Sequence, residues 1–237
     1  MPKFELLAFD LDGTMADTER VSLPDAIDML NSEFNIPVTL DFWFTNYHGL
    51  AGQPLLDALA RDFGVVIANS HFIERRNARI RKVFTSQPLP AAPGLYPTLR
   101  QLAAGGYQMA ICSNSQPERV HLTISHLAGQ TKAGLHLTDM FEGCCFSGVG
   151  STHEPKPAPD VYLAALAQFK IAPTRALAVE DSATGVVAAH KAGMPCVGFT
   201  GLARHPEEER ARLEAAGVVA IMADWAEFPA ILAKLEK

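Results

Sequence analysis

The sequence predicts an α/β protein in which a doubly wound, mainly parallel sheet carries an inserted all-helical domain. From residue 93 onwards, short apolar segments alternate with single helical segments. Strands separated by single helices need crossover connections, which produce parallel sheets with helices on both faces. Between residues 16 and 87, in contrast, apolar residues recur at helical intervals and no strand-like alternation interrupts them.

The first expected strand covers residues 4–9. Five of these six residues are apolar, as in a strand that is buried on both faces. Asp10 and Asp12 follow at once, and Gly13 and Thr14 favour a turn. Because ligands of open parallel sheets bind beyond the carboxyl ends of the strands, we expect an active site at this point.

The helical insertion begins directly after this turn. Glycines at positions 49, 52 and 64 are the expected joints between its helices. The expected helices cover residues 17–35, 41–46, 53–63 and 70–85. We therefore expect a catalytic core made of residues 1–15 and 88–237, and a helical domain made of residues 16–87.

The remaining expected strands also end in polar residues. These strands cover residues 107–112, 143–147, 176–179, 196–199 and 218–222, with helices over 96–103, 117–128, 160–169 and 184–192. The polar residues after them are Ser113, Asn114, Lys156, Glu180 and Asp181. Parallel strand ends converge on one crevice, so we expect these side chains to face the two aspartates of the first turn.

A crevice with three or four carboxylates would repel itself without a cation. Carboxylate oxygens without histidine or thiolate favour Mg²⁺ over zinc. Each cluster also has a purely structural interpretation. The two aspartates could form a turn, the serine and asparagine could be turn formers, the lysine could be solvated, and the glutamate and aspartate could cap the next helix. Their joint occurrence favours the site.

Four motifs resemble those of the haloacid dehalogenase superfamily, in the expected order. They are the sequence FDLDGT at residues 9–14, Ser113-Asn114, Lys156-Pro157 with Pro159-Asp160, and Glu180-Asp181-Ser182 with Gly185. The resemblance covers the chain from about residue 4 to about residue 200, and the helical insertion after the first motif is similar to the branch with a helical cap. It implies a Rossmann-like core.

The resemblance also implies a role for each acid. Asp10 would be the nucleophile that forms an aspartyl phosphate, and Asp12 would be the general acid and then the general base. Mg²⁺ would be held by the Asp10 carboxylate, the Asp12 backbone carbonyl and Asp181, with Glu180 as a further ligand or as a partner of the ligands.

The phosphoryl group has its own implied partners. Ser113 and the backbone of Asn114 would donate hydrogen bonds to its oxygens, and Thr14 belongs to the same expected phosphate-binding set. Lys156 would neutralise charge between the nucleophile and the intermediate. In the helical domain, which would close over the leaving group, we expect His48 and Gln53 to contact the substrate. The arginines at 75, 76 and 79 are further candidates.

The expected reaction is the Mg²⁺-dependent hydrolysis of small phosphorylated metabolites, with sugar phosphates among the candidates. Haloacid dehalogenases lack an acid at the position of Asp12, so dehalogenation is disfavoured. A β-phosphoglucomutase-like mutase is the alternative. Such mutases carry a cap histidine twelve residues after the nucleophile and an arginine in a cap loop, whereas this chain has Ser22 and an arginine-free loop over residues 48–53. A non-catalytic role is a third hypothesis.

Composition limits the partners. The net charge is -6 and no long basic run occurs, which argues against a nucleic-acid partner. The sequence has no apolar stretch of about 18 residues and no signal-like amino terminus, so we expect no membrane partner and a cytoplasmic protein. The four cysteines show no CxxC spacing and are expected to be buried free thiols. A monomer is the default expectation.

Overall fold

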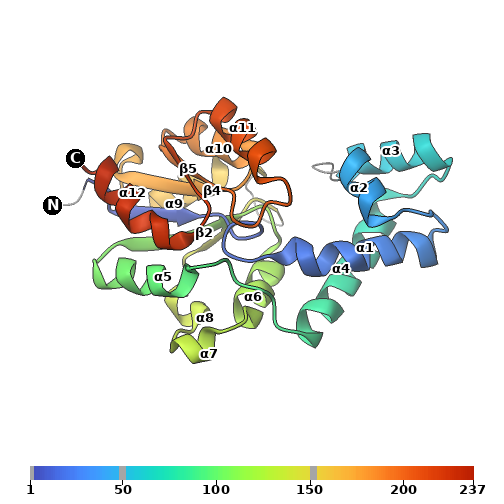
Figure 1. Ribbon diagram of the computed structural model, residues 1–237, viewed down its shortest axis with the longest axis horizontal. Coiled ribbons are helices and arrows are strands. Elements are labelled where there is room, and N and C mark those ends of the chain that lie inside the picture. The colour runs from blue at the N-terminus through green and yellow to red at the C-terminus, as the bar shows by residue number, and fades with distance from the viewer. Residues whose placement is uncertain (1–2, 48–51, 150–153) are drawn as a thin grey trace. The chain divides into compact units, whose positions relative to one another are not determined.

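A computed structural model describes residues 3–47, 52–149 and 154–237, and the chain divides into two compact units (Figure 1). The larger unit contains Met1–Thr18 and Leu89–Lys237, and the smaller contains Glu19–Pro88. The insertion therefore starts slightly later than residue 16. The reason is that the amide of Asp17 donates to the carbonyl of Pro90 and the amide of Ala92 donates to Met15, each at 2.9 Å, which ties these residues to the larger unit.

The larger unit is built on one six-stranded sheet with the order β3-β2-β1-β4-β5-β6, and all neighbouring strands in it are parallel. The expected α/β fold with a Rossmann-like sheet is thereby confirmed. The strands are β1 (Leu6–Phe9), β2 (Gln108–Ser113), β3 (Cys145–Ser147), β4 (Ala176–Glu180), β5 (Cys196–Phe199) and β6 (Ala220–Met222).

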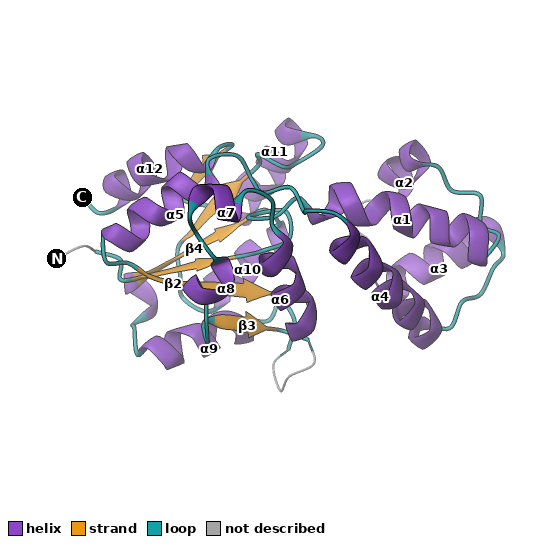
Figure 2. Ribbon diagram, turned by 90° about the horizontal axis from the view of Figure 1, so that it is seen from below, coloured by secondary structure: helices purple, strands orange, loops and turns teal. Residues whose placement is uncertain are grey.

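Helices cover both faces of this sheet (Figure 2). One core packs the β1 side chains Leu6 and Ala8 with residues of α9, α10 and α11. On the opposite face Phe9 packs against Trp225 and against Phe228 of α12. The helices of this unit are α5 (Leu95–Ala104), α6 (Pro117–His126), α7 (Gln130–Ala133), α8 (Leu137–Met140), α9 (Asp160–Phe169), α10 (Ala183–Lys191), α11 (Pro206–Ala216) and α12 (Phe228–Leu235), with the short 3-10 helices η1 (Pro173–Arg175) and η2 (Trp225–Glu227).

The described part of the smaller unit consists of helices joined by loops. Its helices are α1 (Thr18–Glu33), α2 (Leu40–Asn46), α3 (Gly52–Phe63) and α4 (Asn69–Ser86), of which α1 starts at the last residue of the larger unit. They enclose a separate apolar core in which Leu30, Trp43, Tyr47 and Leu59 are almost completely buried. Among the described residues, no helix combines the length and the apolar character that a membrane crossing requires.

The structure adds two helices near the carboxyl terminus that the sequence pattern did not predict, α11 and α12. Helix α11 is mainly polar, with three consecutive glutamates in its first turn and Leu213 as its buried residue, so its apolar periodicity is too weak to recognise. Strands β3 and β6 have three residues each and are shorter than the expected segments.

The cysteines follow the prediction only in part. All four are free thiols, as expected. Cys112 and Cys196 are buried in central strands, but Cys145 is exposed and Cys144 is partly exposed. The expectation of burial is wrong for Cys145 because β3 lies at the edge of the sheet, where Cys145 is the first residue of the strand.

Trp225 connects the last part of the chain to the turn after β1. Its ring is fully buried and meets the Phe9 ring edge-on, with 5.1 Å between the ring centroids. Its indole Nε1 donates a 2.9 Å hydrogen bond to the carbonyl oxygen of Thr14. The position of the turn that carries Asp10 and Asp12 therefore depends on a residue more than 200 positions away.

We expect Trp225→Ala to lower the free energy of unfolding by about 3–5 kcal/mol, because it removes a buried aromatic side chain and leaves a cavity. Trp225→Phe retains much of the packing but leaves the Thr14 carbonyl unpaired, which costs about 1–3 kcal/mol. Urea unfolding measures both, with Val219→Ala as the exposed control. Equal costs for the two variants would show that the hydrogen bond, rather than packing, dominates.

Candidate active site

The register of three strands brings the first site residues to one level. Phe9 of β1 pairs with Ile111 of β2 on one side and with Val179 of β4 on the other. The residues that follow, Asp10, Cys112 and Glu180, therefore lie next to one another at the carboxyl end of the sheet. In a sheet of this order, β1 lies at the topological switch point, where open α/β sheets bind their ligands.

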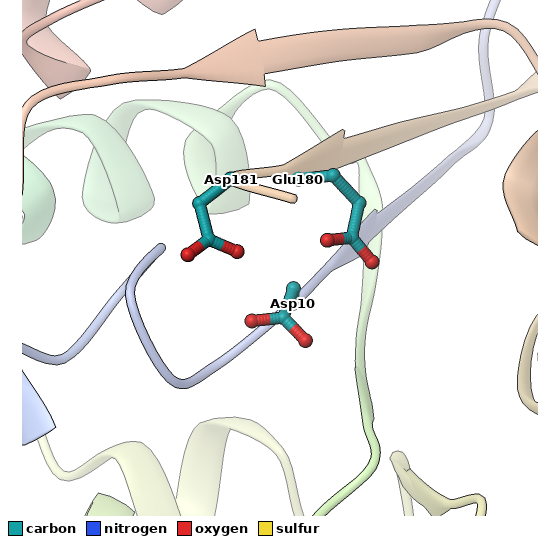
Figure 3. Close-up of side chains that lie close together, drawn as sticks. All are labelled: Asp10, Glu180 and Asp181. Carbon is teal, nitrogen blue, oxygen red and sulfur yellow. The ribbon is translucent and has the colours of Figure 1, made fainter. Parts of the chain in front are cut away.

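Three carboxylates converge at this switch point. Asp10 comes from the end of β1, Glu180 is the last residue of β4, and Asp181 follows it (Figure 3). One carboxylate oxygen from each lies within 4.8 Å of the others. Asp10 and Glu180 are buried, and Asp181 is partly buried. The group has the composition of a site for a hard cation.

Lys156 lies against two of these carboxylates. Its Nζ donates to Asp10 Oδ1 at 2.7 Å, to Glu180 Oε1 at 2.5 Å and to the carbonyl oxygen of Cys112 at 2.7 Å. These three bonds use all three ammonium protons. The same Glu180 oxygen accepts a 2.6 Å hydrogen bond from the Tyr162 hydroxyl. Lys156 is therefore a fixed, buried counter-charge rather than a solvated loop lysine.

The loop that carries Lys156 is held by Asn114. The Asn114 Oδ1 accepts a 2.8 Å hydrogen bond from the Lys156 amide, and the Asn114 Nδ2 donates to the Lys156 carbonyl at 3.2 Å. Ser113 is buried, and its Oγ accepts a 3.0 Å hydrogen bond from the amide of Ser115. The Asn114 side chain thus has a positioning role that the sequence did not suggest.

Burial and mutual charge shift the pKa values of the groups in this cluster. Burial, reinforced by the charge of Glu180, raises the pKa of Asp10 to about 7, although Lys156 acts in the opposite direction. Burial and the charges of Asp10 and Glu180 also raise the pKa of Asp181 well above its usual range. Burial opposes the charge of Lys156 as well, but the two carboxylates beside it raise the pKa of this ammonium group.

These residues fit a bound Mg²⁺. The single ammonium group of Lys156 lies among three carboxylates, so the cluster carries net negative charge when all three acids are ionised. A divalent cation would offset this charge, and oxygen-only donors suit Mg²⁺ better than zinc. The residues that would hold it are Asp10, Glu180 and Asp181.

Two glycines make room for this cluster. A Cβ at Gly185 would lie 1.9 Å from the Glu180 carboxyl carbon, and a Cβ at Gly13 would lie 2.0 Å from Asp181 Oδ2. Gly13 also has φ +91°, a conformation that favours glycine. Gly13 of the first motif therefore leaves space for the Asp181 carboxylate, and Gly185 of the fourth motif leaves space for the Glu180 carboxylate.

Asp12 lies outside the three-carboxylate group and has different partners. Its Oδ1 accepts hydrogen bonds from Thr18 Oγ1 at 2.6 Å and from an Arg119 guanidinium nitrogen at 3.2 Å, and its Oδ2 accepts from Ser115 Oγ at 2.6 Å. Burial acts to raise the pKa of Asp12, but the Arg119 charge and these hydrogen bonds outweigh it and lower the pKa. The two aspartates of the first motif thus occupy different electrostatic environments.

The remaining expected site residues are placed less centrally. Thr14 is buried, and its Oγ1 donates to Asp181 Oδ1 at 3.4 Å. Gln53 is exposed and donates to Asp57 within α3. His48 lies outside the described residues.

Two of the three arginine candidates of the helical unit, Arg75 and Arg79, form ion pairs within that unit. Arg75 is paired with Glu33 at 2.6 Å. Arg79 is paired with Glu33 at 2.9 Å, and also with Asp25 and Asp28. These ion pairs join α4 to α1, so both arginines contribute to contacts between these two helices.

Four residues that contact the predicted site residues were not predicted from the sequence: Thr18, Ser115, Arg119 and Tyr162. Ser115 belongs to the same polar turn as Ser113, which is a signal that could have identified it. Arg119 lies in a polar helical turn and Tyr162 in an apolar helix, so neither differs locally from an ordinary helical residue.

Comparison with known proteins agrees with this geometry. Residues 7–199 match the family described as haloacid dehalogenase-like hydrolase. Phosphoglycolate phosphatase from Haemophilus influenzae is 30% identical over 213 residues, which cover 84% of this chain and 86% of the relative.

Two solved structures share the fold. A haloacid dehalogenase-like protein from Agrobacterium tumefaciens superposes with a TM-score of 0.82 at 24% identity, covering 99% of this chain and 100% of that one. A hydrolase of the same family from Deinococcus radiodurans, solved with bound phosphate and sodium, gives a TM-score of 0.75 at 27% identity and covers 99% and 97%.

The chain is thus an α/β protein with a cluster of acids at the switch point of a parallel sheet. The chain belongs to the family of haloacid dehalogenase-like hydrolases. The resemblance inferred from the four motifs is confirmed.

We expect Gly185→Ala to destabilise the protein by about 1–3 kcal/mol, because the new Cβ overlaps the Glu180 carboxylate. Helix propensity alone would predict the opposite, a gain of up to about 1 kcal/mol. Urea unfolding measures the change, and Val187→Ala on the same helix is the matched control. Mg²⁺ should also raise the melting temperature of the variant less than that of the wild type. A variant as stable and as Mg²⁺-responsive as the wild type would contradict this assignment of Gly185.

Proposed function

We propose that the protein is a Mg²⁺-dependent phosphatase of small phosphorylated metabolites that works through an aspartyl-phosphate intermediate. The observation that carries the proposal is that Asp10 and Asp12, only two residues apart in the sequence, have different surroundings. Asp10 is buried against Lys156 within the carboxylate cluster, whereas Asp12 is held by donors from Thr18, Ser115 and Arg119. A nucleophile and a proton-transfer group require such different surroundings.

In the first proposed step, a carboxylate oxygen of Asp10 attacks phosphorus in line with the leaving oxygen. The bond from phosphorus to the leaving oxygen breaks, and Asp12 gives its proton to that oxygen. Asp10 then carries the phosphoryl group and Asp12 is ionised. The hydrogen bonds and the positive charge beside Asp12 stabilise this ionised state, which is consistent with its lowered pKa.

In the second proposed step, water attacks the phosphorus atom of the aspartyl phosphate. Asp12 accepts a proton from this water, the bond from phosphorus to Asp10 breaks, and inorganic phosphate leaves. Lys156 stays in place during both steps, because its three hydrogen bonds hold it against Asp10, Glu180 and a backbone carbonyl. When bound at the three carboxylates, Mg²⁺ would neutralise charge on the phosphoryl oxygens.

The phosphoryl group is proposed to bind through Ser113, the backbone of Asn114 and Thr14. The Deinococcus relative, which was solved with phosphate, supports a phosphate ligand. The phosphoglycolate phosphatase among the relatives supports a small substrate, and sugar phosphates remain candidates. We propose that the inserted helical domain contributes to substrate selection, with His48 and Gln53 among its residues.

The test is a panel of 2-phosphoglycolate and sugar phosphates, assayed for phosphate release with Mg²⁺ and with excess chelator. We expect release that requires Mg²⁺ and that falls by roughly 10⁴-fold or more in Asp10→Asn, because the nucleophile is lost. Asp139→Asn, an exposed aspartate of α8, is the matched control and should retain activity.

Two outcomes would contradict the proposal. Phosphate release that persists in chelator or in Asp10→Asn would exclude the proposed mechanism. Conversion of β-glucose 1-phosphate to glucose 6-phosphate with little free phosphate would identify the mutase instead, although Ser22 stands where the mutases carry a histidine.

A further inference from the structure

The hydrogen bonds of Asp12 distinguish its two carboxylate oxygens. Each carboxylate oxygen has two lone pairs. Oδ1 accepts two hydrogen bonds, from Thr18 and from Arg119, whereas Oδ2 accepts one, from Ser115. Within the described part of the chain, one lone pair therefore remains for a proton, and it lies on Oδ2.

These donors come from firmly placed elements. The Ser115 amide donates to Ser113 Oγ at 3.0 Å, and the Ser115 carbonyl accepts a 2.6 Å hydrogen bond from Ser147 Oγ at the end of β3. Arg119 lies in the first turn of α6, which begins at Pro117. The segment after β2 thus supplies one donor to each oxygen of Asp12, and these two bonds fix the rotation of the carboxylate.

The Arg119 contact is poorly suited to a purely stabilising role. The Arg119 and Asp12 side chains are 27% and 23% exposed. Ion pairs that are partly open to water contribute only about 0–1 kcal/mol to stability. The contact is better explained by the orientation it imposes on a group that must exchange protons in both steps.

We propose that Arg119 is a positioning residue that occupies Asp12 Oδ1 and directs proton transfer to Asp12 Oδ2. This inference rests on the proposed phosphatase activity, since it concerns how Asp12, the general acid and base of that reaction, is oriented. The proton leaves Oδ2 for the leaving oxygen in the first step and returns to Oδ2 from water in the second, so the proton is balanced over one turnover. Arg119 acts through Asp12 and does not exchange a proton.

The test compares Arg119→Met, Arg119→Lys and Arg212→Met, an exposed arginine of α11 that serves as the control. We expect Arg119→Met to lower kcat by about 10- to 100-fold, part of the contribution of a proton-transfer group, with KM within about threefold of wild type. Arg119→Lys, which keeps one charged donor, should recover most of kcat. In an Asp12→Asn background, Arg119→Met should lower kcat no further, because the two residues act as a unit.

Several results would overturn the inference. A raised KM with unchanged kcat would mean that Arg119 binds an anionic group of the substrate instead. An unchanged kcat, or an equal loss in the Asp12→Asn background, would mean that Arg119 does not act through Asp12. If Arg119→Met does not fold, Arg119→Gln provides the same measurements with a polar side chain.

A stability cycle separates this inference from the proposed function. Urea unfolding of wild type, Arg119→Met, Asp12→Asn and the double variant should show a non-additivity of roughly two- to tenfold in the unfolding equilibrium constant. If the two substitutions are non-additive but the wild type releases no phosphate, the proposed phosphatase activity is refuted while the contact between Arg119 and Asp12 is supported. If the effects of the two substitutions on unfolding are additive, Arg119 does not contact Asp12 in solution, and the inference fails whether or not the protein is a phosphatase.

Discussion

The contact of Lys156 with Asp10 and Glu180 is the interaction on which the site depends. It joins the third motif to residues at the ends of β1 and β4, which the strand register has already placed at one level. Burying these charges is costly, and apolar residues in their place would often give a more stable protein. The cluster is therefore better explained by the chemistry it makes available than by a contribution to folding.

Three further residues support this contact: Tyr162, Asn114 and Gly185. Tyr162 shares the Glu180 oxygen that Lys156 uses, and Asn114 fixes the backbone of Lys156 with two hydrogen bonds. Gly185 leaves the space that the Glu180 carboxylate occupies. A charge that is held in this way needs little rearrangement when a phosphoryl group arrives, which is the condition under which electrostatic stabilisation is most effective.

Much of the fold could be predicted from the sequence because the central strands are short apolar runs that end in polar residues. The same local signal identified Asp10, Lys156 and Asp181. Arg119 could not be predicted as a partner of Asp12, since it is 107 positions away and only the parallel packing of β1 beside β2 brings α6 to the first turn. Helix α11 was missed for a different reason, because its polar composition gives no amphipathic pattern.

The hydrogen bond from Trp225 to the Thr14 carbonyl bears on how the catalytic unit can be delimited. The family match ends at residue 199, before β6 and α12. A fragment cut at that residue would retain all four motifs but lose Trp225 and Phe228, whose rings pack on Phe9. The segment that contains all four motifs is therefore shorter than the segment that the active site needs. In chimaeras with related proteins, the carboxyl-terminal segment should be kept together with the first strand of the same protein.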